Sequence, residues 1–201
     1  MNTPQNTIYN GDTAAGALLV EESRKIAHLL LHDVNSEQWH KAIIIDNILQ
    51  KRSPLSAQRQ VNLIKKRLMM MDRELWKLIY YGSSEITSQA LLAASIKYSR
   101  LVGDFMDTVL REHWQTFTKT ICDSDWIKFL EVCAQVDPKV ETWKESTRKK
   151  LKQVVFRMLA EAKYIDNTRN CKLLPVSIAP EIKKYLVKKN ETYVLSCMEI
   201  T

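Results

Sequence analysis

Glycine and proline, the residues from which tight turns are made, are scarce in this sequence, with 4 Gly and 5 Pro among 201 residues. Their scarcity excludes collagen-like repeats and flexible Pro/Gly linkers, and it leaves little material for the turns of an all-β sandwich. No apolar run approaches the ~20 residues that cross a bilayer. The polar stretch 1–13 also lacks the basic and apolar segments of a secretory signal. The absences predict a soluble, cytoplasmic, all-α protein that does not associate with membranes.

Signatures of catalysis and of cofactor binding are missing as well. The four glycines are isolated, so no glycine-rich phosphate loop can form, and there is no GxSxG motif. Successive cysteines lie 11, 38 and 26 residues apart, which is too far for a CxxC zinc or redox site. His28 and His32 have the spacing of a zincin pair, but only leucines lie between them. We therefore expect no enzymatic activity, no metal site and no cofactor.

The positive charge that is present is concentrated in two blocks. The net charge is +7, from 30 Lys and Arg against 23 Asp and Glu. Residues 47–71 hold six basic side chains and no acidic one, and residues 139–201 hold 14 basic against 7 acidic. The segments 1–46 and 72–138 each carry a net charge of −3. Local fields of this kind indicate an anionic partner more strongly than net charge does.

The first basic block falls on a predicted helix-turn-helix unit. The apolar spacing predicts helices over 36–49, capped by Ser36, and over 54–70, with a joint of about four residues. Ser53 as N-cap and Pro54 as the first helical residue mark the start of the second helix. At 100° per residue its predicted buried face comprises Ala57, Val61, Ile64 and Leu68. The opposite face comprises Arg59, Asn62 and Lys66, with Lys65 and Arg67 on the flanks. This layout is typical of a DNA recognition helix.

The second basic block falls on a similar pair of helices, 126–136 and 146–163, with Ser146 as the predicted cap. Four cations crowd the first turns of the latter helix: Arg148, Lys149, Lys150 and Lys152. Cations at a helix N-terminus oppose the macrodipole and cost about 0.3–1 kcal/mol each, which suggests that an anionic partner retains them. Residues 164–179 form either a small hairpin or an irregular loop. A hairpin would give a winged-helix-like order.

The other expected elements complete an all-α globule. We predict a helix from Asp12 or Thr13 to His32, one over 72–81 that ends at Gly82, and one that Pro180 opens over 181–189. A long apolar helical region over 85–116 has Gly103 as a break or a close-packing point. We divide the chain into an N-terminal helical region, 1–118, and a C-terminal winged-helix-like region, 119–201.

Several strings in this order resemble the BrxA family of bacterial BREX phage-exclusion systems. They are LLVEESR at 18–24, NILQKRSP at 47–54, ALL at 90–92, LVGDFM at 101–106 and ESTRKKL at 145–151. The resemblance extends from about residue 13 to 198. It implies an all-helical accessory protein without enzymatic activity that binds double-stranded DNA through helix-turn-helix elements. The implied partners are other BREX components: a DNA methyltransferase, an AAA-type ATPase and an alkaline-phosphatase-like protein.

Pattern and resemblance together predict the DNA-binding residues. The cations expected to neutralise phosphates are Lys51, Arg52, Arg59, Lys66, Arg148, Lys149, Lys150 and Lys152. The amides expected to reach base edges are those of Asn62 and Gln153. Charge runs also occur on ordinary solvated helix faces, so two alternatives stay open. One is a scaffold whose basic blocks bind acidic protein surfaces, and the other is an RNA-binding helical bundle.

Overall fold

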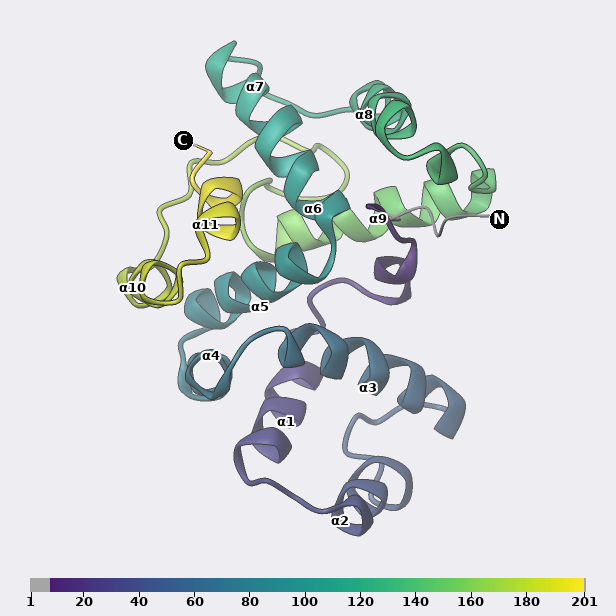
Figure 1. Ribbon diagram of the computed structural model, residues 1–201, viewed down its shortest axis with the longest axis vertical. Helices are drawn as coiled ribbons and strands as arrows, with labels where there is room; N and C mark the ends of the chain where they lie inside the picture. The colour runs from purple at the N-terminus through teal and green to yellow at the C-terminus, as the bar shows by residue number, and fades with distance from the viewer. Residues whose placement is uncertain (1–7, 201) are drawn as a thin grey trace, which may run out of the picture.

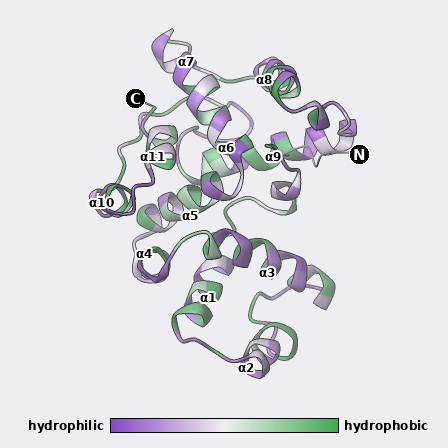
Figure 2. Cartoon of the chain, viewed as in Figure 1, coloured by the Kyte–Doolittle hydropathy of each residue, from purple (hydrophilic) through white to green (hydrophobic). Residues whose placement is uncertain are grey.

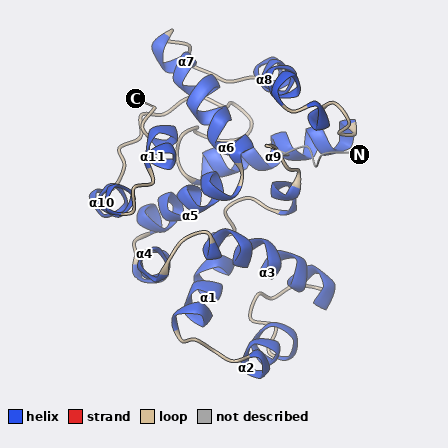
Figure 3. Cartoon of the chain, in the orientation of Figure 1, coloured by secondary structure: helices blue, strands red, loops and turns tan. Residues whose placement is uncertain are grey.

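A computed structural model describes residues 8–200, and within that range every regular element is a helix (Figure 3). In chain order the elements are η1 Asp12–Ala15, α1 Val20–Leu31, α2 Ser36–His40, η2 Lys41–Ile45, α3 Pro54–Met69, α4 Arg73–Tyr81, α5 Ser84–Tyr98, α6 Arg100–Phe105, η3 Met106–Leu110, α7 Arg111–Gln115, α8 Asp123–Val136, η4 Pro138–Val140, α9 Glu145–Glu161, α10 Pro180–Lys188 and α11 Thr192–Met198. The predicted all-α class is confirmed. No helix in the described range is long and apolar enough to span a bilayer.

The helices α1, α2 and α3 form one end of the molecule, and α6, α7 and α8 form the other (Figure 1). Between them α5 runs through the middle, with α10 and α11 on one side and α9 on the other. The short helix η1 contacts both α3 and α9. Both of these helices begin at the right-hand edge of Figure 1 and run inward, so their N-termini are exposed along one edge.

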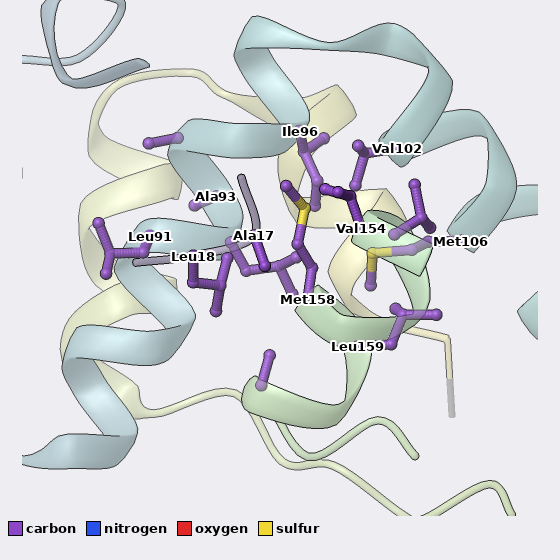
Figure 4. Packing of buried hydrophobic residues seen from close by; sticks show 14 of the residues in the cluster. Ala17, Leu18, Leu91, Ala93, Ile96, Val102, Met106, Val154, Met158 and Leu159 are labelled. Atoms are coloured by element: carbon purple, nitrogen blue, oxygen red, sulfur yellow. The ribbon is translucent and has the colours of Figure 1, made fainter. Parts of the chain in front are cut away.

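The core is built around α5, as its broad apolar surface predicts. Every residue from Thr87 to Ile96 is buried, because neighbouring helices cover α5 on all sides. Figure 4 shows Ile96 of α5 beside Met158 of α9, with Leu18 and Ala17 between Met158 and Leu91. Figure 2 shows the mixed, amphipathic colouring of the peripheral helices. A single cluster of buried side chains extends from Tyr9 to Ile200. The proposed division after residue 118 stays a prediction.

Aromatic rings join α9 to the α6–α8 end of the molecule. Phe105 of α6 lies 5.3 Å from Trp126 and 5.1 Å from Phe129 of α8, both in edge-to-face geometry. It also lies 5.8 Å from Phe156 of α9. Such pairs stabilise a core by about 0.5–1.5 kcal/mol beyond the area they bury. This cluster fixes where α8 and α9 lie relative to each other.

Local start and stop signals were confirmed at several helices. Ser53 caps α3 by accepting a hydrogen bond from the Ser56 N–H, Asp72 caps α4 before it ends at Gly82, and Pro180 is the first residue of α10. In contrast, α5 breaks at Ser99, whose backbone is extended, and Gly103 is a close-packing point inside α6. A Cβ at Gly103 would lie 2.3 Å from the Tyr193 hydroxyl oxygen.

Several predicted helix boundaries were wrong, three of them at or near a helix start. The helix expected from Asp12 to His32 is two elements, because the chain unwinds after η1 and Leu19 adopts a left-handed φ of 53° before α1. Asn35, in a capping box with Gln38, caps α2 in place of Ser36. The helix α9 begins at Glu145, so Ser146 lies inside its first turn and does not cap it.

The N-terminal segment is anchored to the C-terminal half of the chain. The backbone N–H groups of Ile8 and Tyr9 donate to Asp137 Oδ2, at 2.9 and 3.0 Å. Further along, the Leu18 N–H donates to Glu161 Oε2 at 2.8 Å. These hydrogen bonds hold η1 and the residues that follow it between α3 and α9.

Candidate nucleic-acid interface

The two helices predicted for the first helix-turn-helix unit are both present, but the joint between them is longer than predicted. Its first helix ends in the π-helical turn η2 at Ile45, before Leu49, so residues 46–53 separate it from α3. The β-branched run 43–45 disfavours further helix, and Asn47 and Gln50 adopt φ values of 44° and 52°. The Asn47 side chain accepts from the Lys51 N–H at 3.0 Å and donates to its carbonyl at 2.9 Å. One asparagine thus closes the turn between the helices.

The two faces of α3 are arranged as predicted. Its inward face is almost fully buried and comprises Ala57, Val61, Ile64 and Leu68, together with Leu63. Its outward face is exposed and includes Arg59, Asn62 and Lys66. The pattern of one apolar and one cationic face therefore holds in three dimensions.

Arg67, expected on the flank of α3, is instead buried, with 3% of its surface exposed. Its guanidinium donates to the carbonyl of Gly16 at 2.8 Å and to that of Ala17. Burial lowers the pKa of Arg67 to about 10, so the group stays charged at neutral pH. Arg67 therefore fastens the segment between η1 and α1 onto α3 and is unavailable to an external partner.

Lys51 is also engaged inside the protein. Its Nζ lies 2.6 Å from Glu22 Oε1 of α1, and both side chains are about one-fifth exposed. Burial alone would raise the pKa of Glu22, but the hydrogen bond and charge of Lys51 outweigh it and hold that pKa below its usual range. On the same side Lys25 Nζ donates to the Ile48 carbonyl at 2.7 Å. Two cations thus hold the turn against α1.

The cations left free on this unit lie at and around the outward face of α3. Arg52 and Arg59 are exposed and have no ion-pair or hydrogen-bond partner for their side chains within residues 8–200. Lys65 Nζ lies 4.6 Å from the centre of the Trp39 ring, and Lys66 Nζ lies 3.7 Å from Asp12 Oδ2 with both side chains more than half exposed. Exposed contacts of this kind are weak and easily exchanged for an anionic ligand.

In the second unit, two of the predicted phosphate-binding cations are held by partners within the chain. Arg148 donates to the carbonyls of Val140, Glu141 and Trp143 at 3.1–3.2 Å, which closes the turn between α8 and α9. Lys152 Nζ lies 2.5 Å from Asp123 Oδ2 at the start of α8.

The other three predicted residues of α9 remain exposed. Lys149 is 3.6 Å from Glu145 in a solvated i,i+4 pair. Lys150 and Gln153 have no side-chain partner in the described part of the chain. The first three turns of α9 therefore keep two cations and an amide available at the surface.

The segment 164–179 is neither a regular hairpin nor a featureless loop. Two isolated antiparallel bridges pair Ile165 with Leu173 and Thr120 with Lys172. Asp166 closes the turn by accepting from the backbone N–H groups of Asn167 and Lys172, at 2.7 and 2.9 Å. The turn borders a cleft of about 750 Å³, which α9 and residues 120–123 also line.

Three exposed side chains beside these faces were not predicted from the sequence: Arg157, Arg169 and Gln58. Arg169 at the turn and Arg157 on α9 line the cleft, although Arg157 pairs with Glu161 at 2.9 Å. On α3, Gln58 Nε2 donates to Asn62 Oδ1 at 2.9 Å. The i,i+4 spacing of Gln58 and Asn62 was the available signal for this pair.

Fold and surface define an all-α protein that presents free cations on two helices, α3 and α9, whose N-termini lie along one edge. Residues 7–190 match the family model for BrxA. The chain belongs to the BrxA family.

Similar proteins cover nearly the whole chain. The chain is 40% identical over 193 residues to a Paramagnetospirillum magneticum (strain AMB-1) protein named "BREX protein BrxA", covering 96% of this chain and 97% of that one. It is 32% identical over 189 residues to an Escherichia coli O9:H4 (strain HS) protein of the same name, covering 94% and 89%. A crystal structure of an uncharacterized protein from Magnetospirillum magneticum superposes with a TM-score of 0.89 at 39% identity, covering 96% of this chain and all of the other.

Proposed function

We propose that this protein is a non-catalytic, double-stranded-DNA-binding subunit of a BREX phage-defence system. The names of its relatives support the BREX assignment. The observation that carries DNA binding is the outward face of α3, where Arg59 is exposed and unpaired opposite a fully buried apolar stripe, with Arg52 equally free just before the helix. No acidic residue occurs in 47–71 to repel a phosphate.

The shape of this surface favours a duplex over a small anion. A recognition helix enters the major groove with its N-terminal turns, while residues around it contact the backbone. The N-terminus of α3 is exposed, and α9 begins along the same edge of the molecule (Figure 1). Lys149 and Lys150 lie in the first two turns of α9, so we assign them phosphate contacts with the same duplex.

Internal partners narrow the set of DNA-binding cations. Lys51, Arg148 and Lys152 hold turns and helices together, so the proposal assigns phosphate contacts to the cations without such a role: Arg52, Arg59, Lys66, Lys149 and Lys150. Gln153 is placed to add a polar contact from α9.

Fluorescence anisotropy with a labelled 25-base-pair duplex in rising salt tests the proposal. Log affinity should fall with log salt by about 0.9 for each phosphate contact. Arg59→Glu and Lys150→Glu should each weaken binding at least fivefold. Lys184→Glu is the matched control, because Lys184 is an exposed cation on α10, on the other side of the molecule. Absence of binding at low salt, or equal losses in all three variants, would refute the assignment.

A second candidate function is a protein-interaction scaffold for the other BREX components: the methyltransferase, the AAA-type ATPase and the phosphatase-like protein. The exposed apolar side chains of α8, Ile127, Val132 and Val136, favour a protein partner at that end of the molecule. Retention of these components by Arg59→Glu after it has lost DNA binding would show that the two functions use separate surfaces. A surplus of structured RNA tests the RNA alternative, which predicts that the RNA displaces the duplex.

A further inference from the structure

We propose that α3 selects A·T base pairs in the major groove, with Leu55 contacting the thymine methyl group and the Gln58–Asn62 amide pair contacting adenine. This inference rests on the proposed function, because it assigns a sequence preference to the same helix. Leu55, Gln58 and Asn62 lie 3 and 4 residues apart, so they share the outward face of α3.

Leu55 is an apolar side chain on the outward face of α3, where it contributes nothing to phosphate binding. It is the second residue of α3, and 63% of its surface is exposed. The N-terminal residues of a recognition helix are those that meet base edges. In the major groove the only apolar group that a base edge presents is the C5-methyl of thymine. Leu55 therefore matches thymine in both position and chemistry.

The Gln58–Asn62 pair matches adenine through its unused hydrogen-bonding groups. The hydrogen bond from Gln58 Nε2 to Asn62 Oδ1, 2.9 Å long, leaves Gln58 Oε1 and Asn62 Nδ2 without partners in the described chain. One acceptor and one donor then face outward together. Turning both amides over exchanges the two roles but keeps the same pattern. Adenine presents the complementary N7 acceptor and N6 donor.

The same pattern disfavours the other bases. Guanine presents two acceptors, N7 and O6, and the free amide oxygen of the pair would face one of them. Cytosine presents only the N4 donor, which could satisfy the free amide oxygen of the pair but leaves the free amide N–H group without an acceptor. Arg59 lies between Leu55 and Asn62 on the outward face and is left to hold the backbone phosphates.

The first test isolates the methyl group. Wild type and Leu55→Ala are titrated with two duplexes of one A·T-rich sequence, one with thymine and one with uracil, which lacks only the C5-methyl. Wild type should bind the thymine duplex about threefold to fourfold tighter for each methyl that Leu55 covers. Leu55→Ala should lose this preference and bind the uracil duplex as wild type does. Met69→Ala, an exposed apolar residue at the far end of α3, should keep the preference.

The second test isolates adenine N7. Replacing adenine by 7-deazaadenine should weaken wild-type binding roughly tenfold and leave Asn62→Ala unaffected. Equal binding of wild type to all these duplexes would overturn base selection while leaving DNA binding intact. If Leu55→Ala loses equal affinity for the thymine and uracil duplexes, the contact of Leu55 with the thymine methyl is also overturned. No binding to any duplex would refute the proposed function as well.

Discussion

Arg67 and Arg59 lie on the same helix and carry the same charge, so replacing each by methionine separates folding from binding. Arg67→Met keeps the length of the aliphatic chain but removes the guanidinium donors to the carbonyls of Gly16 and Ala17. Two hydrogen bonds from a charged donor contribute about 1.5–3 kcal/mol each, and removal of a desolvated charge offsets part of that loss. We expect a net decrease of about 2–4 kcal/mol in the free energy of unfolding.

Urea unfolding followed by circular dichroism measures this difference. At a slope of about 2 kcal/mol per molar urea, the midpoint of Arg67→Met should fall by about 1–2 M. Arg59→Met should unfold as wild type does, because Arg59 has no partner within residues 8–200, and its log–log salt slope for duplex binding should become shallower by about 0.9. If the two variants differ in stability by less than about 0.5 kcal/mol, the structural role of Arg67 is refuted.

Three further substitutions test the internal contacts. Lys51→Met should lower the free energy of unfolding by about 0.5–1 kcal/mol at pH 7. Lys51 lowers the pKa of Glu22 in the folded state. The ion pair therefore contributes its full stabilisation to the folded protein above about pH 4.3, the ordinary pKa of Glu, and this stabilisation is lost as the pH falls through the lower pKa of the folded state. If wild type and Lys51→Met differ in urea midpoint as much at about pH 2.5 as at pH 7, the pairing is contradicted. Arg148→Met should lower the free energy of unfolding by about 1–2 kcal/mol. The salt slope of its DNA binding should equal that of wild type, and a shallower slope would show that Arg148 contacts a phosphate. Gly103→Ala should lower the free energy of unfolding by about 2 kcal/mol, because the new Cβ would meet the Tyr193 hydroxyl. Calorimetry should show a Tm lower by about 4–8 °C, and an unchanged Tm would contradict the close approach.

Features that depend on neighbouring residues were predictable from the sequence. The Ser53–Pro54 start of α3 and the end of α4 at Gly82 follow from capping chemistry that acts within one turn. The buried face of α3 follows from the repeat of 3.6 residues per turn, and the burial of α5 follows from its broad apolar surface. These signals established the all-α class and the two faces of the candidate recognition helix.

The hydrogen-bond and ion-pair partners of the long cationic side chains could not be predicted in the same way. A helical wheel places Arg67 on a flank, but its guanidinium reaches a carbonyl 51 residues earlier in the chain. Arg148 and Lys152 suggested an external anion because they oppose the helix dipole, and the structure gives them acceptors at η4 and Asp123. Nor did any signal favour a break at Ser99 over Gly103. Each of these outcomes depends on segments that only the tertiary fold brings together.

The anchoring of the N-terminal segment has a consequence for synthesis of the chain. Ile8, Tyr9 and Leu18 bond to carboxylates of Asp137 and Glu161, between 128 and 143 residues later. A ribosome delivers the N-terminus first, so these backbone groups emerge long before their acceptors exist. These backbone groups remain unpaired while α5, whose residues from Thr87 to Ile96 are all buried in the folded protein, is already outside the exit tunnel. These contacts can therefore form only after residue 161 has emerged, and until then the exposed apolar segments of the nascent chain are expected to bind chaperones.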